Sequence, residues 1–200
     1  MSALSLLYLR SRALPVTAAA LAGVVLVAAW SADWLQDRPH FDHTARAPVI
    51  VLAPLLAAAA IGTALHSHAE ELDRTAARRW WPRLVLHLVV ATALAAGALA
   101  AAVPGHPEAF GAPAMVRNVL GSTGVTVASA ALLGARPSWL PMTVYGSAVY
   151  LAAPDGPDRA AALWAWPLQP GPEAGAWAVA VAAYGAGAAL LAVRGPGRSR

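Results

Sequence analysis

Histidines and carboxylates gather in two short stretches, and such side chains bind divalent metals or transfer protons. The first stretch holds two histidines three apart, His40 and His43, beside Asp37 and Asp42. Imidazole and carboxylate groups are common ligands of zinc. However, Pro39 argues against the helix that would bring the two histidines to one side. A solvated polar loop between two apolar runs therefore explains this stretch better than a metal site does.

The second stretch carries His66, His68, Glu70 and Glu71, and His87 follows in the next apolar run. A membrane hydrolase would need such groups inside the bilayer, whereas most of these lie between two apolar runs. No His-Glu-x-x-His motif, no Gly-x-Ser-x-Gly motif and no glycine-rich phosphate loop occurs. We therefore expect no catalytic residue, metal or cofactor here, and any ATP hydrolysis would take place on a partner chain. A membrane-embedded metal enzyme is the weaker alternative.

A third polar group lies in the apolar run that begins near residue 114. Arg117 and Asn118 stand close to its start, and Ser122 and Thr126 follow. A charged side chain is costly in lipid, so it indicates a functional site by default. Arg117 is buried with a functional role, or its side chain extends to the outer headgroups. Separately, the polar face of this run lines a pathway, or its hydroxyls bond to neighbouring helices.

The composition places all these residues in a membrane protein. Of the 200 residues, 58% are hydrophobic and 12% are charged, and the mean hydropathy is +0.55. A soluble domain usually carries about 25% charged residues. The chain has no cysteine, which excludes disulfides and cysteine-bound metals. All fourteen basic residues are arginine, which is typical of a GC-rich bacterial genome.

Six apolar runs predict an all-α, polytopic integral membrane protein with one transmembrane domain over residues 1–200. A helix needs about 20 residues to cross a hydrocarbon core of about 30 Å, so the fifth run is short. Merging the fourth and fifth runs into one hairpin inside the membrane is the alternative. Pro54 predicts a kink in the second run, and the prolines and glycines of 103–113 predict an irregular turn. The expected spans are 13–31, 47–65, 83–103, 114–133, 138–153 and 175–193.

Arginine positions predict the orientation of these spans. Residues 66–83 form the most charged stretch of the chain, with four arginines between two apolar runs. Arginine is enriched on the cytoplasmic side of membranes, so we expect this stretch and both termini in the cytoplasm. Ten arginines then fall inside and four outside. The inside set is Arg10, Arg12, Arg74, Arg78, Arg79, Arg83, Arg136, Arg194, Arg198 and Arg200, and the outside set is Arg38, Arg46, Arg117 and Arg159.

The last outer segment, 154–174, is too apolar for a simple loop in water. Residues 158–169 include Trp164 and Trp166 among alanines and leucines. We expect this piece to be a broken, re-entrant segment whose backbone is covered by neighbouring helices.

This layout resembles the membrane subunit of bacterial ABC transporters of the ABC-2 type. Residues 2–12, with spaced leucines and two arginines, resemble the amphipathic N-terminal elbow of that family. Residues 69–80 resemble its cytoplasmic coupling helix, and residues 158–169 resemble its re-entrant helices. The run Trp-Ala-Trp-Pro-Leu-Gln-Pro at 164–170 is similar to one found in small actinobacterial membrane proteins of this kind.

The resemblance implies a permease subunit of an ATP-driven transporter in the cell membrane, an exporter rather than an importer. It also implies a homodimer whose pathway is lined by spans two and five, and a separate ATPase chain. The residues that would dock this ATPase are Glu70, Glu71, Asp73, Arg74, Arg78 and Arg79. The alternative is a non-transporting accessory, immunity or assembly protein that binds other membrane subunits. No nucleic-acid partner is expected, because topology already explains the arginines, and the substrate stays open.

Overall fold

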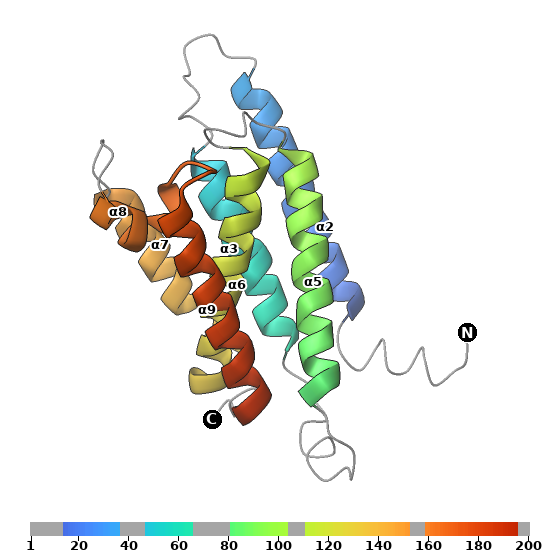
Figure 1. Cartoon of the computed structure of the whole chain (residues 1–200). Helices are drawn as coiled ribbons and strands as arrows, with labels where there is room; N and C mark the ends of the chain where they lie inside the picture. Colours follow the sequence, from blue (N-terminus) through green and yellow to red (C-terminus); the bar gives the residue numbers. More distant parts are fainter. Residues whose placement is uncertain (1–13, 37–46, 66–80, 104–110, 153–158, 196–200) are drawn as a thin grey trace.

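The structure is a computed structural model, and it describes residues 14–36, 47–65, 81–103, 111–152 and 159–195. Every regular element within these ranges is helical, so the all-α prediction is confirmed for them. The long helices run side by side as a bundle (Figure 1). The elements are α2 (Leu14–Gln36), α3 (Ala47–Ala64), α5 (Trp81–Ala102), α6 (Ala112–Leu133), α7 (Leu140–Ala152), α8 (Arg159–Trp164), the 3₁₀ helix η2 (Trp166–Leu168) and α9 (Ala174–Arg194).

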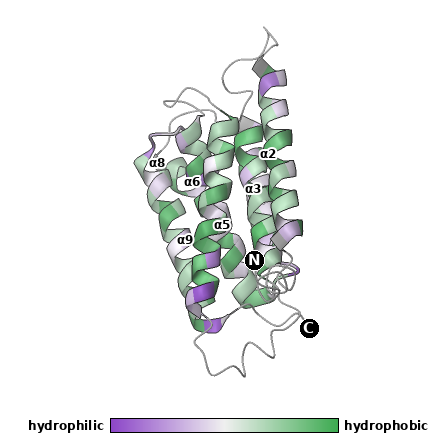
Figure 2. Ribbon diagram, turned by 90° about the vertical axis from the view of Figure 1, so that its right-hand side faces the viewer, coloured by the Kyte–Doolittle hydropathy of each residue, from purple (hydrophilic) through white to green (hydrophobic). Residues whose placement is uncertain are grey.

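Four of these helices, α2, α5, α6 and α9, are long and apolar enough to cross a membrane. The apolar part of α3, Pro48–Ala64, is shorter. α7 has 13 residues and therefore reaches only about 20 Å at 1.5 Å per residue. Hydrophobic residues follow most of the helical ribbon, and hydrophilic ones gather near the helix ends (Figure 2). Large apolar side chains also cover the outside of the bundle, as expected for helices that face lipid.

One predicted boundary was wrong. α6 begins at Ala112, so Pro113 lies in its first turn and not in an irregular turn that extends to residue 113. A proline fits there because the first amide groups of a helix have no intrahelical acceptor. α2 continues to Gln36, beyond the end of the predicted span 13–31.

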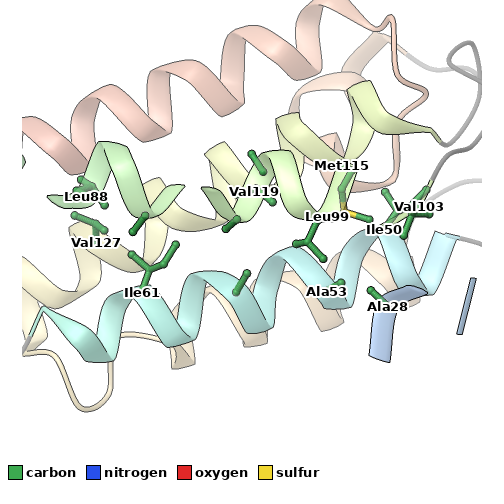
Figure 3. Packing of buried hydrophobic residues seen from close by; sticks show 14 of the residues in the cluster. Ala28, Ile50, Ala53, Ile61, Leu88, Leu99, Val103, Met115, Val119 and Val127 are labelled. Atoms are coloured by element: carbon green, nitrogen blue, oxygen red, sulfur yellow. The ribbon is translucent and has the colours of Figure 1, made fainter. Parts of the chain in front are cut away.

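α6 is the central helix of the bundle. Its most extensive contacts are with α9, followed by α3 and α5, and most of its residues are buried. In Figure 3, Ile61 of α3 lies near Leu88 of α5 and Val127 of α6, and Ile50 of α3 lies near Val103 and near Met115 of α6. This packing holds the two ends of α6 within the protein, which matters because α6 carries the polar residues.

Glycines allow α6 and α9 to approach until their backbones touch. A Cβ atom at Gly187 would lie 2.3 Å from the Gly124 carbonyl oxygen, and one at Gly124 would lie 2.4 Å from the Tyr184 nitrogen. No side chain fits at either position, which is the usual reason for glycine at close membrane-helix contacts. Gly185 lies two residues before Gly187 on α9, and a Cβ atom there would have no atom within 4 Å.

Candidate functional site

The candidate site lies at the end of the bundle where α3, α6 and α9 begin. Here the chain between α7 and α9 is a broken segment, defined as residues 159–171. α8 ends at Trp164, η2 adds one short turn, and Gln169 is extended with φ −80° and ψ 152°. Residues 159–169 therefore do not form one continuous helix, and the predicted re-entrant position of 158–169 in a membrane stays a prediction. Broken helices leave carbonyl groups without helical donors, so side chains must supply donors where the segment is buried.

Arg117 supplies two of those donors from the second turn of α6. Its side chain is 0% exposed. Nη1 donates to the Pro170 carbonyl at 2.6 Å, and Nη2 donates to the Gln169 carbonyl at 2.7 Å. The alternative in which Arg117 extends to the headgroups is therefore wrong, because the guanidinium bonds to neighbouring backbone inside the protein.

Asn118 supplies two more donors beside Arg117. Its Nδ2 donates to the Pro167 carbonyl at 2.8 Å and to the Ile50 carbonyl at 3.0 Å. Its Oδ1 accepts from Nε of Arg117 at 3.2 Å. Both donors and the acceptor of this 1% exposed amide are thus in use. We call Arg117 and Asn118, with the four carbonyl groups that they bind, the polar clamp.

The Ile50 carbonyl is available to Asn118 because of Pro54. In an α-helix, the amide of residue 54 would donate to the carbonyl of residue 50. Proline has no amide hydrogen, so this bond of α3 cannot form. Asn118 provides the missing donor from α6. The kink at Pro54 and the buried polar role of Asn118 were each considered from the sequence, but no sequence signal linked them.

Aromatic side chains hold the broken segment from two further helices. The Trp166 ring is 2% exposed and stacks on Tyr145 of α7, with ring centres 6.4 Å apart. It also lies against Gly121 of α6, where a Cβ would come 2.4 Å from the ring. The Tyr145 hydroxyl donates to the Trp164 carbonyl, and Nε1 of Trp177 on α9 donates to the Gly171 carbonyl at 2.8 Å. No sequence motif linked Tyr145 or Trp177 to these carbonyl groups, because the pairing depends on how α7 and α9 pack against the broken segment.

The guanidinium of Arg117 is balanced by carbonyl groups and not by a directly bonded carboxylate. Glu173 is the acidic residue whose charge acts on Arg117. Its carboxylate instead accepts from the Gly175 amide at 3.4 Å and caps α9. The polar clamp therefore carries a positive charge inside the protein. Burying a charge within the membrane costs free energy, so such a residue indicates a functional site by default.

Ser122 and Thr126, the other predicted polar residues of α6, lie farther along the helix and are buried at 2% and 1% exposure. The Oγ1 atoms of Thr126 and Thr123 have no hydrogen-bond partner. The Thr126 methyl group faces Gly62 of α3, since a Cβ at Gly62 would lie 2.4 Å from it. These threonine hydroxyls therefore do not bond to neighbouring helices, and in this single chain they are enclosed.

A groove lies on the side of the bundle between α3 and α7, the helices of predicted spans two and five. Its volume is about 820 Å³, and its lining is mostly apolar. Leu52 and Leu56 line it from α3, and Trp139, Thr143 and Tyr150 line it from α7. Leu52, Leu56 and Tyr150 are each more than half exposed, so the groove opens towards the surroundings of the bundle.

Most of the remaining predicted site residues fall outside the described part of the chain. The docking residues Glu70, Glu71, Asp73, Arg74, Arg78 and Arg79 and the histidines His40, His43, His66 and His68 lie outside the described residues. His87 is in α5 and is half-buried. Among the residues that the structure describes, no group of three or more histidine, aspartate and glutamate side chains could hold a metal ion.

Comparisons with known proteins do not identify the chain. No family model, no curated protein and no solved structure matches it.

Proposed function

We propose that this chain is the membrane-spanning permease subunit of an ABC-type transporter in the cell membrane, driven by a separate ATPase chain. One observation carries the proposal: a short helix, a broken segment and a long helix follow one another as α7, α8–η2 and α9. This order corresponds to span five, the re-entrant piece and span six of the ABC-2 layout.

The polar clamp supports a re-entrant position for the broken segment. Irregular backbone is tolerated at membrane depth only where protein covers it or a water-filled cavity adjoins it. Four carbonyl groups at this end of the bundle receive side-chain donors from α6, and the Gly171 carbonyl receives one from α9. A loop in water would need none of these bonds, because water would satisfy its backbone.

The charges of the described residues support the proposed orientation. Arg83, Arg136 and Arg194 stand at the end where α5 begins and α6 and α9 end. Asp33 and Glu173 stand at the opposite end, together with Arg117 and Arg159, so the charges there cancel. By the positive-inside bias, the arginine end faces the cytoplasm. The six-span topology with both termini inside also counts α3 and α7 as spans, in addition to the four longer helices.

The groove between α3 and α7 supports a homodimer whose pathway lies at spans two and five. In one copy this groove is open on its side and lined by apolar groups, with hydroxyls from Thr143, Ser147 and Tyr150. A second copy facing it would enclose the space between the two subunits. The apolar lining favours a substrate with a large apolar surface, transported by export.

The decisive experiment isolates the chain with its partners. The full chain is purified from its native membrane in mild detergent, partners are identified by mass spectrometry, and ATPase activity is measured. We expect a nucleotide-binding subunit at about one per copy of this chain, as in transporters with two of each subunit. Recovery with another membrane protein and no ATPase would replace the proposal with an accessory or assembly role.

A further inference from the structure

The proline break of α3 and the broken segment share one side chain, Asn118. We propose that Pro54 and Asn118 form a mechanical relay between α3 and the broken segment. Pro54 leaves the Ile50 carbonyl free, and Asn118 uses this carbonyl to hold the segment, so that a change of α3 at Pro54 shifts the segment. The coupling itself requires no ATPase; its use in transport rests on the proposed function.

The position of each proline in α3 decides whether a backbone carbonyl loses its helical donor. α3 contains two prolines, Pro48 and Pro54. Pro48 is the second residue of the helix, where an amide hydrogen would have no intrahelical acceptor. Pro54 lies in the interior, where its missing hydrogen removes one bond and weakens the helix at that point. Only Pro54 therefore frees a buried carbonyl that a neighbour must satisfy.

Both Nδ2 hydrogens and the Oδ1 atom of Asn118 are engaged in hydrogen bonds. One Nδ2 hydrogen binds the Ile50 carbonyl and the other binds the Pro167 carbonyl. Oδ1 is oriented by Nε of Arg117, so the amide cannot turn over without losing bonds. A shift of Ile50 thus displaces the group that also positions Pro167 in η2.

Ile50 and Pro167, whose carbonyls both accept from Asn118, lie in different parts of the fold. Ile50 is 0% exposed and belongs to the main hydrophobic core, so the first turns of α3 cannot move without their neighbours. Pro167 is buried beside Trp166, which stacks on α7 and lies against α6. The bond network therefore joins α3 to the piece of chain that lies between α7 and α9. In the transporter, α3 is also the helix that leads into the charged 66–83 stretch.

Hydrogen exchange of the full chain in detergent or nanodiscs tests the relay. The reporters are amides of the broken segment whose bonds are known, Leu168 to the Ala165 carbonyl and Gln169 to the Trp166 carbonyl. Pro54→Ala restores a backbone donor to Ile50 and competes with Asn118. It should speed exchange of these amides about three- to tenfold, the equivalent of one hydrogen bond. Pro48→Ala is the matched control and should leave exchange unchanged.

Double variants separate a relay from general loosening. In a relay, Pro54→Ala combined with Asn118→Leu should exchange no faster than Asn118→Leu alone, because both changes remove the same link. Trp177→Phe removes a bond from α9 that does not involve α3, so its effect should multiply with that of Pro54→Ala. The relay would be overturned if the effects of Pro54→Ala and Asn118→Leu on the exchange rates multiplied in the double variant. Equal exchange rates in Pro54→Ala and Pro48→Ala would also overturn it. If Asn118→Leu does not fold, the two proline variants still decide.

The relay and the proposed function fail in different ways. Absence of an ATPase from the purified complex would end the permease proposal and would not affect the exchange results. An ATPase at the expected ratio together with unchanged exchange in Pro54→Ala would leave the permease proposal intact and remove the relay.

Discussion

Asn118 lies with its Nδ2 3.0 Å from the carbonyl oxygen of Ile50, in the position where a backbone amide of α3 would donate if residue 54 were not proline. A polar side chain from α6 thereby completes the hydrogen bonding of another helix. The same amide holds the broken segment at Pro167. This relationship makes the end of the bundle where α6 begins the most specifically constructed part of the described chain.

Replacing Arg117 with lysine should destabilise the protein although the charge is kept. The guanidinium forms two parallel bonds to the adjacent carbonyls of Gln169 and Pro170, and a lysine ammonium cannot reproduce this fork. Each buried carbonyl left without a donor costs about 1–3 kcal/mol, so we expect Arg117→Lys to lower the free energy of unfolding by a similar amount. Denaturant unfolding in detergent measures this change. Wild-type stability in Arg117→Lys would show that charge alone matters at this position.

Gly187→Ala should separate α6 from α9. The new methyl group would meet the Gly124 backbone, which cannot move aside as a flexible side chain could. Overpacking of this kind costs about 1–3 kcal/mol. Gly185→Ala is the control on the same helix, because nothing lies within 4 Å of its Cβ position. The two variants are compared by thermal unfolding in the same detergent, and equal midpoints would contradict the close contact.

Thr123→Val should leave the protein as stable as wild type or make it more stable. The Thr123 hydroxyl is buried and has no hydrogen-bond partner, so an isosteric apolar side chain removes an unsatisfied group. We expect a gain of up to about 1 kcal/mol in the free energy of unfolding. Thr92→Val is the comparison, since the Thr92 hydroxyl donates to the Leu88 carbonyl at 2.7 Å. A loss of stability in Thr123→Val larger than that in Thr92→Val would indicate that this hydroxyl has a ligand.

Single cysteines should report the orientation of the bundle, because the chain contains none. Exposed positions are Arg136 at the arginine end and Pro172 next to the broken segment. In intact cells, a membrane-impermeant thiol reagent should label Pro172→Cys and should label Arg136→Cys only after permeabilisation. The reverse pattern would place the arginine end outside and would reject the proposed topology.

The charged stretch 66–83 should determine coupling to the ATPase. Glu70→Ala combined with Arg74→Ala removes an acid and a base four residues apart and should uncouple ATP hydrolysis from transport without unfolding the chain. Asp42→Ala combined with Arg46→Ala is the matched control, with the same spacing in a stretch predicted on the opposite side. Both double variants are assayed for hydrolysis and transport in proteoliposomes with the ATPase. Unchanged coupling in the Glu70 and Arg74 variant would reject the docking role.

Local properties of the sequence determined the helices. Each predicted apolar run contains one helix, because a helix satisfies its own backbone and needs no distant partner in lipid. The break around Trp166 and Pro167 was also predictable, since proline and the mixed apolar pattern act locally. The boundary error at Pro113 has a local origin too, because the first turn of a helix accepts proline.

Only the tertiary structure decided the roles of the polar residues. Whether Arg117 reaches headgroups or carbonyls depends on which helices enclose it, and its acceptors lie more than fifty residues away in sequence. Asn118 bonds to α3 and η2 at carbonyls 68 and 49 residues away. Tyr145 and Trp177 bond to carbonyls of the broken segment that helix packing brings within reach. Gly185 and Gly187 are equivalent in the sequence pattern, yet only Gly187 touches α6. A membrane helix forms by itself, whereas the partner of a buried donor is chosen when the helices pack.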